Sequence, residues 1–79
     1  MTVVVDRRDP RWNDASWRTE TLLATIADHR LTSAEIATLT GRSVDTVRQW
    51  RSGRHIAIPT TALRLLILEL AVGGRNALL

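Results

Sequence analysis

Apolar residues recur along most of this chain at intervals of three and four, which is the spacing of one face of an α-helix. Glycine, proline and short polar residues interrupt this pattern and mark the ends of the periodic segments. We therefore expect helices over residues 15–29, from just after Thr32 to Thr40, over 44–52, and from Pro59 to about Val72. The pattern predicts an all-α fold.

The first expected helix begins after Asp14, whose carboxylate is a good N-cap. Trp12 and Trp17 lie at or before its start, and tryptophans in such positions pack into a core more often than they stack on bases. The apolar positions of this helix mostly form one stripe, which we expect to face the core: Trp17, Leu22, Leu23, Ile26 and Ala27.

The segment from Thr32 to Gly53 contains two short helices with clear start and stop signals. Thr32 and Glu35 have the spacing of a capping box, in which each side chain accepts the backbone N–H of the other residue. Gly41 lies where the chain must turn with a positive φ, which glycine adopts without steric cost. Ser43 then offers a second N-cap, and Gly53 closes the second helix.

The second of these helices divides into an apolar side and a polar side. At about 100° per residue, Val47 and Trp50 share one side of it. The opposite side carries Asp45, Arg48, Gln49 and Ser52. Such groups suit base edges in the DNA major groove, because arginine binds guanine, glutamine binds adenine and a carboxylate accepts from cytosine N4. A solvated polar surface, which most short helices have, is the alternative interpretation.

The two capped helices and the glycine turn between them resemble the lambda-repressor-like helix-turn-helix family, in which the second helix enters the major groove. The resemblance covers roughly residues 22–70 and is carried by Ile36, Ala37, Gly41, Val47 and Trp50. It implies a phosphate contact from Ser33, at the start of the first motif helix. It also implies base contacts from four residues of the second: Val44, Asp45, Arg48 and Gln49. Arg42 departs from the family, which usually has an aliphatic residue there.

The run WRSGRHIAIP, from Trp50 to Pro59, resembles small phage repressors, including those encoded beside anti-CRISPR genes. The resemblance implies a sequence-specific repressor of phage or mobile-element origin that binds double-stranded DNA as a homodimer at an inverted repeat. It further implies regulation of its own or a neighbouring promoter, such as that of an anti-CRISPR operon. An antitoxin, or another protein-interaction module that also binds DNA, is the alternative.

Basic residues gather around the second motif helix, although the net charge of the whole chain is only +3. Between Arg42 and His55, four arginines stand against one acidic residue, Asp45, so this window alone carries a net charge of +3. A basic patch of this kind is typical of proteins that bind the DNA backbone. We expect phosphate contacts from seven side chains: Ser33, Arg42, Ser43, Arg51, Ser52, Arg54 and Thr60.

The last expected helix is apolar on two sides. One side is expected to face the core and carries Leu63, Leu66, Ile67 and Leu70. The other side carries Leu65, Leu68 and Val72. A second apolar side in a small protein favours contact with another copy of the chain, so we expect this side to form the dimer interface. Packing of Leu65 or Leu68 under the N-terminal or C-terminal segment is the alternative.

These elements predict one compact domain of four to five helices over residues 15–74, which contains the helix-turn-helix motif and the dimerisation helix. Residues 1–14 are expected to form an N-terminal arm and residues 75–79 a tail. The arginines of the arm either follow the DNA backbone or groove or lie in a solvated segment that nearby aspartates partly neutralise.

The composition argues against several other classes of function. The chain has no cysteine, so neither a disulfide framework nor a thiolate zinc site is expected. We recognise no carboxylate pair, activated nucleophile or phosphate-binding glycine loop, and therefore expect no catalytic activity, metal, cofactor or small-molecule ligand. No segment has the apolar length of a membrane span or signal peptide, so we expect a cytoplasmic protein without membrane contact.

Overall fold

The computed structural model describes residues 8–53 and 56–73 of the chain. Over these residues a 3₁₀-helix, η1 (Pro10–Asn13), precedes the α-helices α1 (Ala15–His29), α2 (Ser33–Thr40), α3 (Val44–Ser52) and α4 (Thr60–Ala71). The predicted all-α class is confirmed. The α-helix limits agree with those expected from the sequence to within a single residue, and the 3₁₀-helix is an addition.

Local capping bonds explain where the two middle helices begin. The Glu35 N–H donates to the Thr32 hydroxyl at 3.1 Å, and the Thr32 N–H donates to the Glu35 carboxylate at 2.9 Å, so the predicted capping box is present. At the start of α3 the Ser43 hydroxyl accepts the Thr46 N–H at 3.1 Å. Each helix therefore satisfies part of its own first turn without help from the rest of the fold.

The predicted turn glycines also end the helices as expected. Gly41 follows α2 with a φ of 69°, and Gly53 follows α3 with a φ of 64°. The next N–H after Gly41, that of Arg42, donates to the Ala37 carbonyl at 3.1 Å. This i to i+5 bond is typical of a Schellman closure, which reverses the chain within a few residues and brings α3 back against α2.

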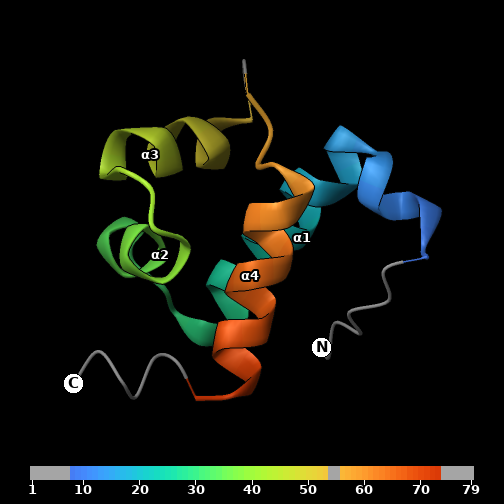
Figure 1. Cartoon of the computed structure of the whole chain (residues 1–79). Helices are drawn as coiled ribbons and strands as arrows, with labels where there is room; N and C mark the ends of the chain where they lie inside the picture. The colour runs from blue at the N-terminus through green and yellow to red at the C-terminus, as the bar shows by residue number, and fades with distance from the viewer. Residues whose placement is uncertain (1–7, 54–55, 74–79) are drawn as a thin grey trace.

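The core lies where the α-helices meet around α4. Figure 1 shows α4 in the middle of the molecule, with α1 behind it, α2 beside its middle and α3 level with its N-terminal end. Contacts of α2 and α1 with α4, and of α3 with α2 and α1, enclose the apolar residues. The largest fully buried side chains are Trp50, Leu22, Ile36, Ile58, Leu63, Leu66 and Val47.

The buried side of α1 differs from the expected stripe. Leu23 is 44% exposed and Ala27 is also exposed, whereas Thr21 and Thr25 are buried. The Thr25 hydroxyl donates to the Thr21 carbonyl at 2.8 Å, so its polar group is satisfied within the helix. The expectation for Leu23 and Ala27 was wrong because the buried side of α1 includes Thr21 and Thr25 in their place.

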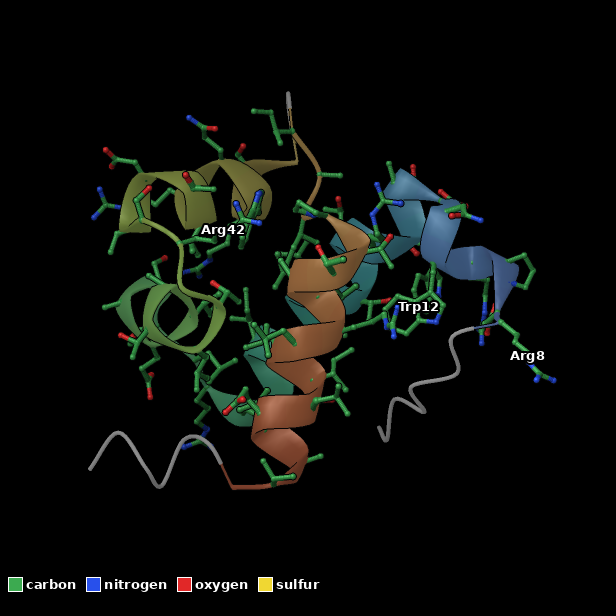
Figure 2. The ribbon with its side chains drawn as sticks, viewed as in Figure 1. Arg8, Trp12 and Arg42 are labelled. Carbon is green, nitrogen blue, oxygen red and sulfur yellow. The ribbon has the colours of Figure 1, made fainter. Side chains whose placement is uncertain are left out.

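The segment just before α1 belongs to the folded domain, and the expected arm at residues 1–14 is therefore too long. Trp12 in η1 is only 3% exposed, and its ring meets that of Trp17 edge to face at a centroid distance of 4.9 Å. Figure 2 shows Trp12 beside α4, on the opposite side of the molecule from Arg42. The expectation that these tryptophans pack into the fold is confirmed for Trp12.

The start of η1 is fixed by an aspartate and an arginine at its surface. The Asp9 carboxylate accepts the backbone N–H of Arg11 at 2.9 Å and also bonds to the Arg11 guanidinium. The hydrogen bond from the Arg11 side chain, together with its backbone N–H, lowers the pKa of Asp9. Figure 2 shows the preceding Arg8 pointing away from the helices. Residues 1–7, Gly74 and the expected tail at 75–79 lie outside the described residues.

Candidate nucleic-acid interface

The inner side of α3 anchors this short helix in the core. Val47 is fully buried and Trp50 is 1% exposed, as the sequence pattern predicted. Both side chains lie on one side of α3, and the helix packs against α2 and α1. Because these two anchors lie a single helical turn apart, they fix the rotation of α3 about its axis and hold its polar side toward solvent.

The outer side of α3 presents the residues expected to read bases. Asp45, Arg48 and Gln49 are exposed, and Val44 lies half-buried at the edge of the same surface. We call Val44, Asp45, Arg48, Gln49 and Ser52 the outer surface of α3. All the predicted base-reading residues therefore lie on one accessible surface.

One ion pair lies on this surface, between Arg48 and Asp45. Arg48 Nη1 is 3.7 Å from Asp45 Oδ1, and the two side chains are 71% and 89% exposed. An exposed pair of this length contributes little to stability because water and salt screen it. Either side chain can therefore leave the pair for a better-placed partner at small energetic cost.

Two expected phosphate ligands come together from different helices. Arg51 near the end of α3 donates from Nη1 to the hydroxyl of Ser33, the first residue of α2, at 2.8 Å. Arg42 is exposed in the turn between α2 and α3, and Figure 2 shows it beside α3. These three residues therefore border the outer surface of α3 or the adjacent end of α2.

The remaining expected phosphate ligands take several roles. Besides capping α3, the Ser43 hydroxyl donates to the Thr46 hydroxyl at 2.9 Å, and the Ser52 hydroxyl donates to the Gln49 carbonyl at 2.8 Å. Both serines remain exposed. Arg54 lies outside the described residues.

The hydroxyl of Thr60, another expected phosphate ligand, takes part in a contact within the fold. This hydroxyl donates to the Trp12 carbonyl at 2.8 Å in a partly buried position, so it connects the start of α4 to η1. Arg18, which the sequence analysis did not single out, donates from Nη1 to the same carbonyl and from Nε to the Ile58 carbonyl, each at 2.8 Å. No sequence signal marks these bonds, because their partners are backbone atoms brought close only by folding.

The charge of the described segment around α3 is positive. Residues 42–53 contain three arginines against one aspartate, a net charge of +2. Because Arg42, Arg48 and Arg51 are all exposed, this charge faces solvent rather than a buried partner. A surface with hydrogen-bonding side chains in the middle and arginines around them can bind a polyanion and also distinguish groups along it.

A separate apolar surface lies on α4. Leu65 is 40% exposed, Leu68 is 44% exposed and Val72, just after the helix, is 79% exposed. Residues 1–7 and 74–79, which include most of the segments under which the alternative would bury Leu65 or Leu68, lie outside the described residues, so that alternative stays open. Their expected place in a dimer interface stays a prediction.

Comparison with protein families, with curated proteins and with solved structures finds no match to this chain. None of the described helices combines the length and the apolar character that a membrane crossing requires. The function is therefore inferred from the chain's own residues.

Proposed function

We propose that this protein is a sequence-specific repressor that binds double-stranded DNA through α3 and acts as a homodimer on an inverted-repeat operator. The observation that supports this most directly is the division of α3 into two sides. Val47 and Trp50 fix the helix in the core, while Asp45, Arg48 and Gln49 stand exposed on the opposite side. A helix held in this way fits the major groove with its polar side against the bases.

Each side chain on the outer surface of α3 has a base edge that suits it. The Arg48 guanidinium can donate two hydrogen bonds to guanine O6 and N7, and the Gln49 amide can pair with adenine N6 and N7. The Asp45 carboxylate can accept from cytosine N4 or hold Arg48 in position for guanine. Val44 at the edge of the surface suits the methyl group of thymine.

The surrounding residues suit the phosphate backbone. Arg42 in the turn before α3 and Arg51 near the end of the helix supply exposed positive charge, and Ser33 places a hydroxyl and the N-terminus of α2 beside Arg51. Binding of these groups releases counterions from the DNA, so affinity falls as salt rises. A dimer bound across a promoter, its own or that of a neighbouring gene, blocks polymerase by occupying the site.

The first test is a titration of the purified protein with DNA from upstream of its own gene and with a scrambled duplex, each at two salt concentrations. We expect much tighter binding to the upstream DNA and weaker binding to both duplexes at higher salt. If both duplexes bind equally and weakly, the outer surface of α3 is only a solvated polar surface and the proposal is wrong.

Two arginine variants separate base recognition from backbone binding. Arg48→Ala is expected to cost about 1–3 kcal/mol of binding free energy on the upstream DNA and much less on the scrambled duplex. Arg51→Ala is the matched control, since it removes an equal charge from the same helix and is expected to weaken both duplexes alike. Equal losses from Arg48→Ala on both duplexes would show that Arg48 binds phosphate and reads no base.

A second candidate function is supported by the exposed apolar residues Leu65, Leu68 and Val72. An antitoxin or another protein-interaction module would bind a different protein through this side of α4 while α3 stays free for DNA. Specific DNA binding by a chain that does not associate with itself would favour this candidate over the homodimer.

A further inference from the structure

The exposed side of α4 has the residue spacing of a coiled-coil interface. Its outward positions follow one another at intervals of four, three and four residues, which is the alternation of d and a positions in a heptad repeat. We call these residues the outward seam: Thr61, Leu65, Leu68 and Val72. The seam is separate from the core side of α4, where Leu63 and Leu66 are fully buried.

Two opposite charges flank the outward seam. Arg64 precedes Leu65 and Glu69 follows Leu68, so at about 100° per residue they lie on opposite edges of the seam, at the g and e positions. The Nε atom of Arg64 is buried and has no hydrogen-bond partner among the described residues. No ion pair with another described residue is found for Arg64 or Glu69. A second chain can supply the ion-pair partner that neither charge has within residues 8–53 and 56–73.

We propose that two copies of this chain pair through α4 in parallel, with the outward seams in contact and Arg64 of each chain bonded to Glu69 of the other. In parallel coiled coils a g position faces the e position five residues further along in the partner helix, which matches the separation of these two residues. An antiparallel pair would instead set like edges together, Arg64 near Arg64 and Glu69 near Glu69. The charges therefore select the parallel orientation.

The position of α3 favours the same orientation. Figure 1 shows α3 level with the N-terminal end of α4. In a parallel pair both copies of α3 lie at the same end of the dimer and can face one DNA molecule, whereas in an antiparallel pair they lie at opposite ends. This step rests on the proposed homodimer and adds its orientation, its register and two residues that determine its specificity.

The outward seam is small, which predicts when the pairing forms. Its three apolar side chains are partly exposed in the single chain. The surface that they can bury is much smaller than the roughly 800 Å² per partner of a stable interface. We therefore expect weak pairing in the free protein and strong pairing when two chains bind adjacent half-sites, because DNA raises their effective concentration.

Cysteine cross-linking tests the orientation, since the natural chain has no cysteine. Parallel pairing places each seam position beside the same position of the partner, so Thr61→Cys alone and Val72→Cys alone should each form a disulfide dimer with oxidised glutathione. Antiparallel pairing would give disulfide dimers only when the two variants are mixed. That result would overturn the proposal, as would the absence of any cross-link at high protein concentration and on the upstream DNA.

Charge reversal tests the Arg64 to Glu69 pairs. In the Thr61→Cys background, Arg64→Glu or Glu69→Arg alone sets like charges opposite each other and should reduce cross-linking several-fold. A mixture of the two variants restores opposite charges and should recover cross-linking between unlike chains. Glu20→Arg on the exposed surface of α1 is the matched control and should leave cross-linking unchanged. Equal cross-linking in all variants would show that the charges do not direct the pairing.

Cross-linking and DNA binding are measured separately, so their failures can be distinguished. Each variant is first compared with the parent by circular dichroism, which detects loss of helix. A chain that cross-links through Thr61→Cys but binds the upstream and scrambled duplexes equally retains the α4 pairing and overturns the repressor proposal. A chain that binds the upstream DNA specifically without any cross-link overturns the pairing alone.

Discussion

Arg30 ends α1 in the left-handed conformation, with a φ of 53°, although it is not a glycine. This conformation lets the Leu31 N–H donate to the Ile26 carbonyl at 3.1 Å and directs the buried Leu31 into the core. A residue with a Cβ pays about 1–2 kcal/mol for this geometry, and glycine avoids most of that cost. Part of the gain is offset because glycine is more flexible in the unfolded chain.

We therefore expect Arg30→Gly to be more stable than Arg30→Ala by about 0.5–1 kcal/mol in urea unfolding. Arg30→Ala is the matched control, because it removes the same side chain and keeps the left-handed strain. The comparison between the two variants isolates the backbone from whatever the Arg30 side chain contacts. Equal stability of the glycine and alanine variants would contradict the assignment of strain to this residue.

Thr60 offers a direct comparison between a structural role and the phosphate contact expected from the sequence. Its hydroxyl donates to the Trp12 carbonyl at 2.8 Å. Thr60→Val should destabilise the fold by about 1 kcal/mol and leave the DNA affinity of the folded protein unchanged. Thr60→Ser keeps the hydroxyl and should retain most of the stability. A valine variant of normal stability with weakened DNA binding would show that the Thr60 hydroxyl binds phosphate and does not stabilise the fold.

At the scale of elements, the glycines that follow α2 and α3 have similar backbones and different surroundings. Gly41 and Gly53 have φ values of 69° and 64°. A Cβ on Gly41 would meet no atom within 4 Å, whereas a Cβ on Gly53 would lie 3.2 Å from the Thr19 Cγ2 atom of α1. Only the second substitution therefore adds a steric cost to the conformational one.

We expect Gly41→Ala to lower the free energy of unfolding by about 1–2 kcal/mol, because alanine adopts the left-handed backbone conformation less readily than glycine. Gly53→Ala should cost more, and Thr19→Ser should reduce the excess because it removes the methyl group and keeps the hydroxyl that bonds to the Ala15 carbonyl. Urea unfolding of the single and double variants measures this coupling. Additive effects of Gly53→Ala and Thr19→Ser would show that the methyl group is not the obstacle.

These elements also show which parts of the fold the sequence can predict. The Thr32 capping box and Gly41 act on their own neighbours in the chain, so their residue types were sufficient to place the ends of α2. The buried side of α1 was harder, because Thr25 reaches the core by donating its hydroxyl to the preceding turn, at the Thr21 carbonyl. A hydropathy value counts the hydroxyl as polar but does not include the hydrogen bond that lowers the free-energy cost of burying it.

In the candidate site, too, local features could be predicted from the sequence and contacts between distant residues could not. The outer surface of α3 was predictable because Val47 and Trp50 define the buried side of one short helix, and the opposite side follows from the helical repeat. The bond between Arg51 and Ser33 was not predictable as a contact, since it joins residues 18 positions apart through the packing of α2 on α3. Sequence identified both residues as candidates, and only the fold brought them together.

At the scale of the whole molecule, Arg18 connects segments that lie far apart in the chain. Its guanidinium donates to the Ile58 carbonyl, 40 residues away, and to the Trp12 carbonyl in η1. It thereby holds η1 and the segment that leads into α4 against α1. The expectation of an N-terminal arm ending at residue 14 failed for this reason: Trp12 is held by its carbonyl as well as by its buried ring.

The chain contains a natural comparison for this arginine. Arg18 and Arg64 are both half-buried, but Arg18 donates to two backbone carbonyls whereas the buried Arg64 Nε has no partner among the described residues.

Methionine retains much of the length of the arginine stem and none of its donors. Arg18→Met should cost about 1.5–3 kcal/mol, since two partly buried carbonyls lose a charged donor. Arg64→Met should stay within about 0.5 kcal/mol of the parent or gain slightly, because it removes an unsatisfied donor. Both are measured by urea unfolding at low protein concentration, where pairing through α4 does not contribute. If the two variants lose equal stability, the cost comes from burying any arginine stem, and the bonds to Trp12 and Ile58 do not hold the molecule together.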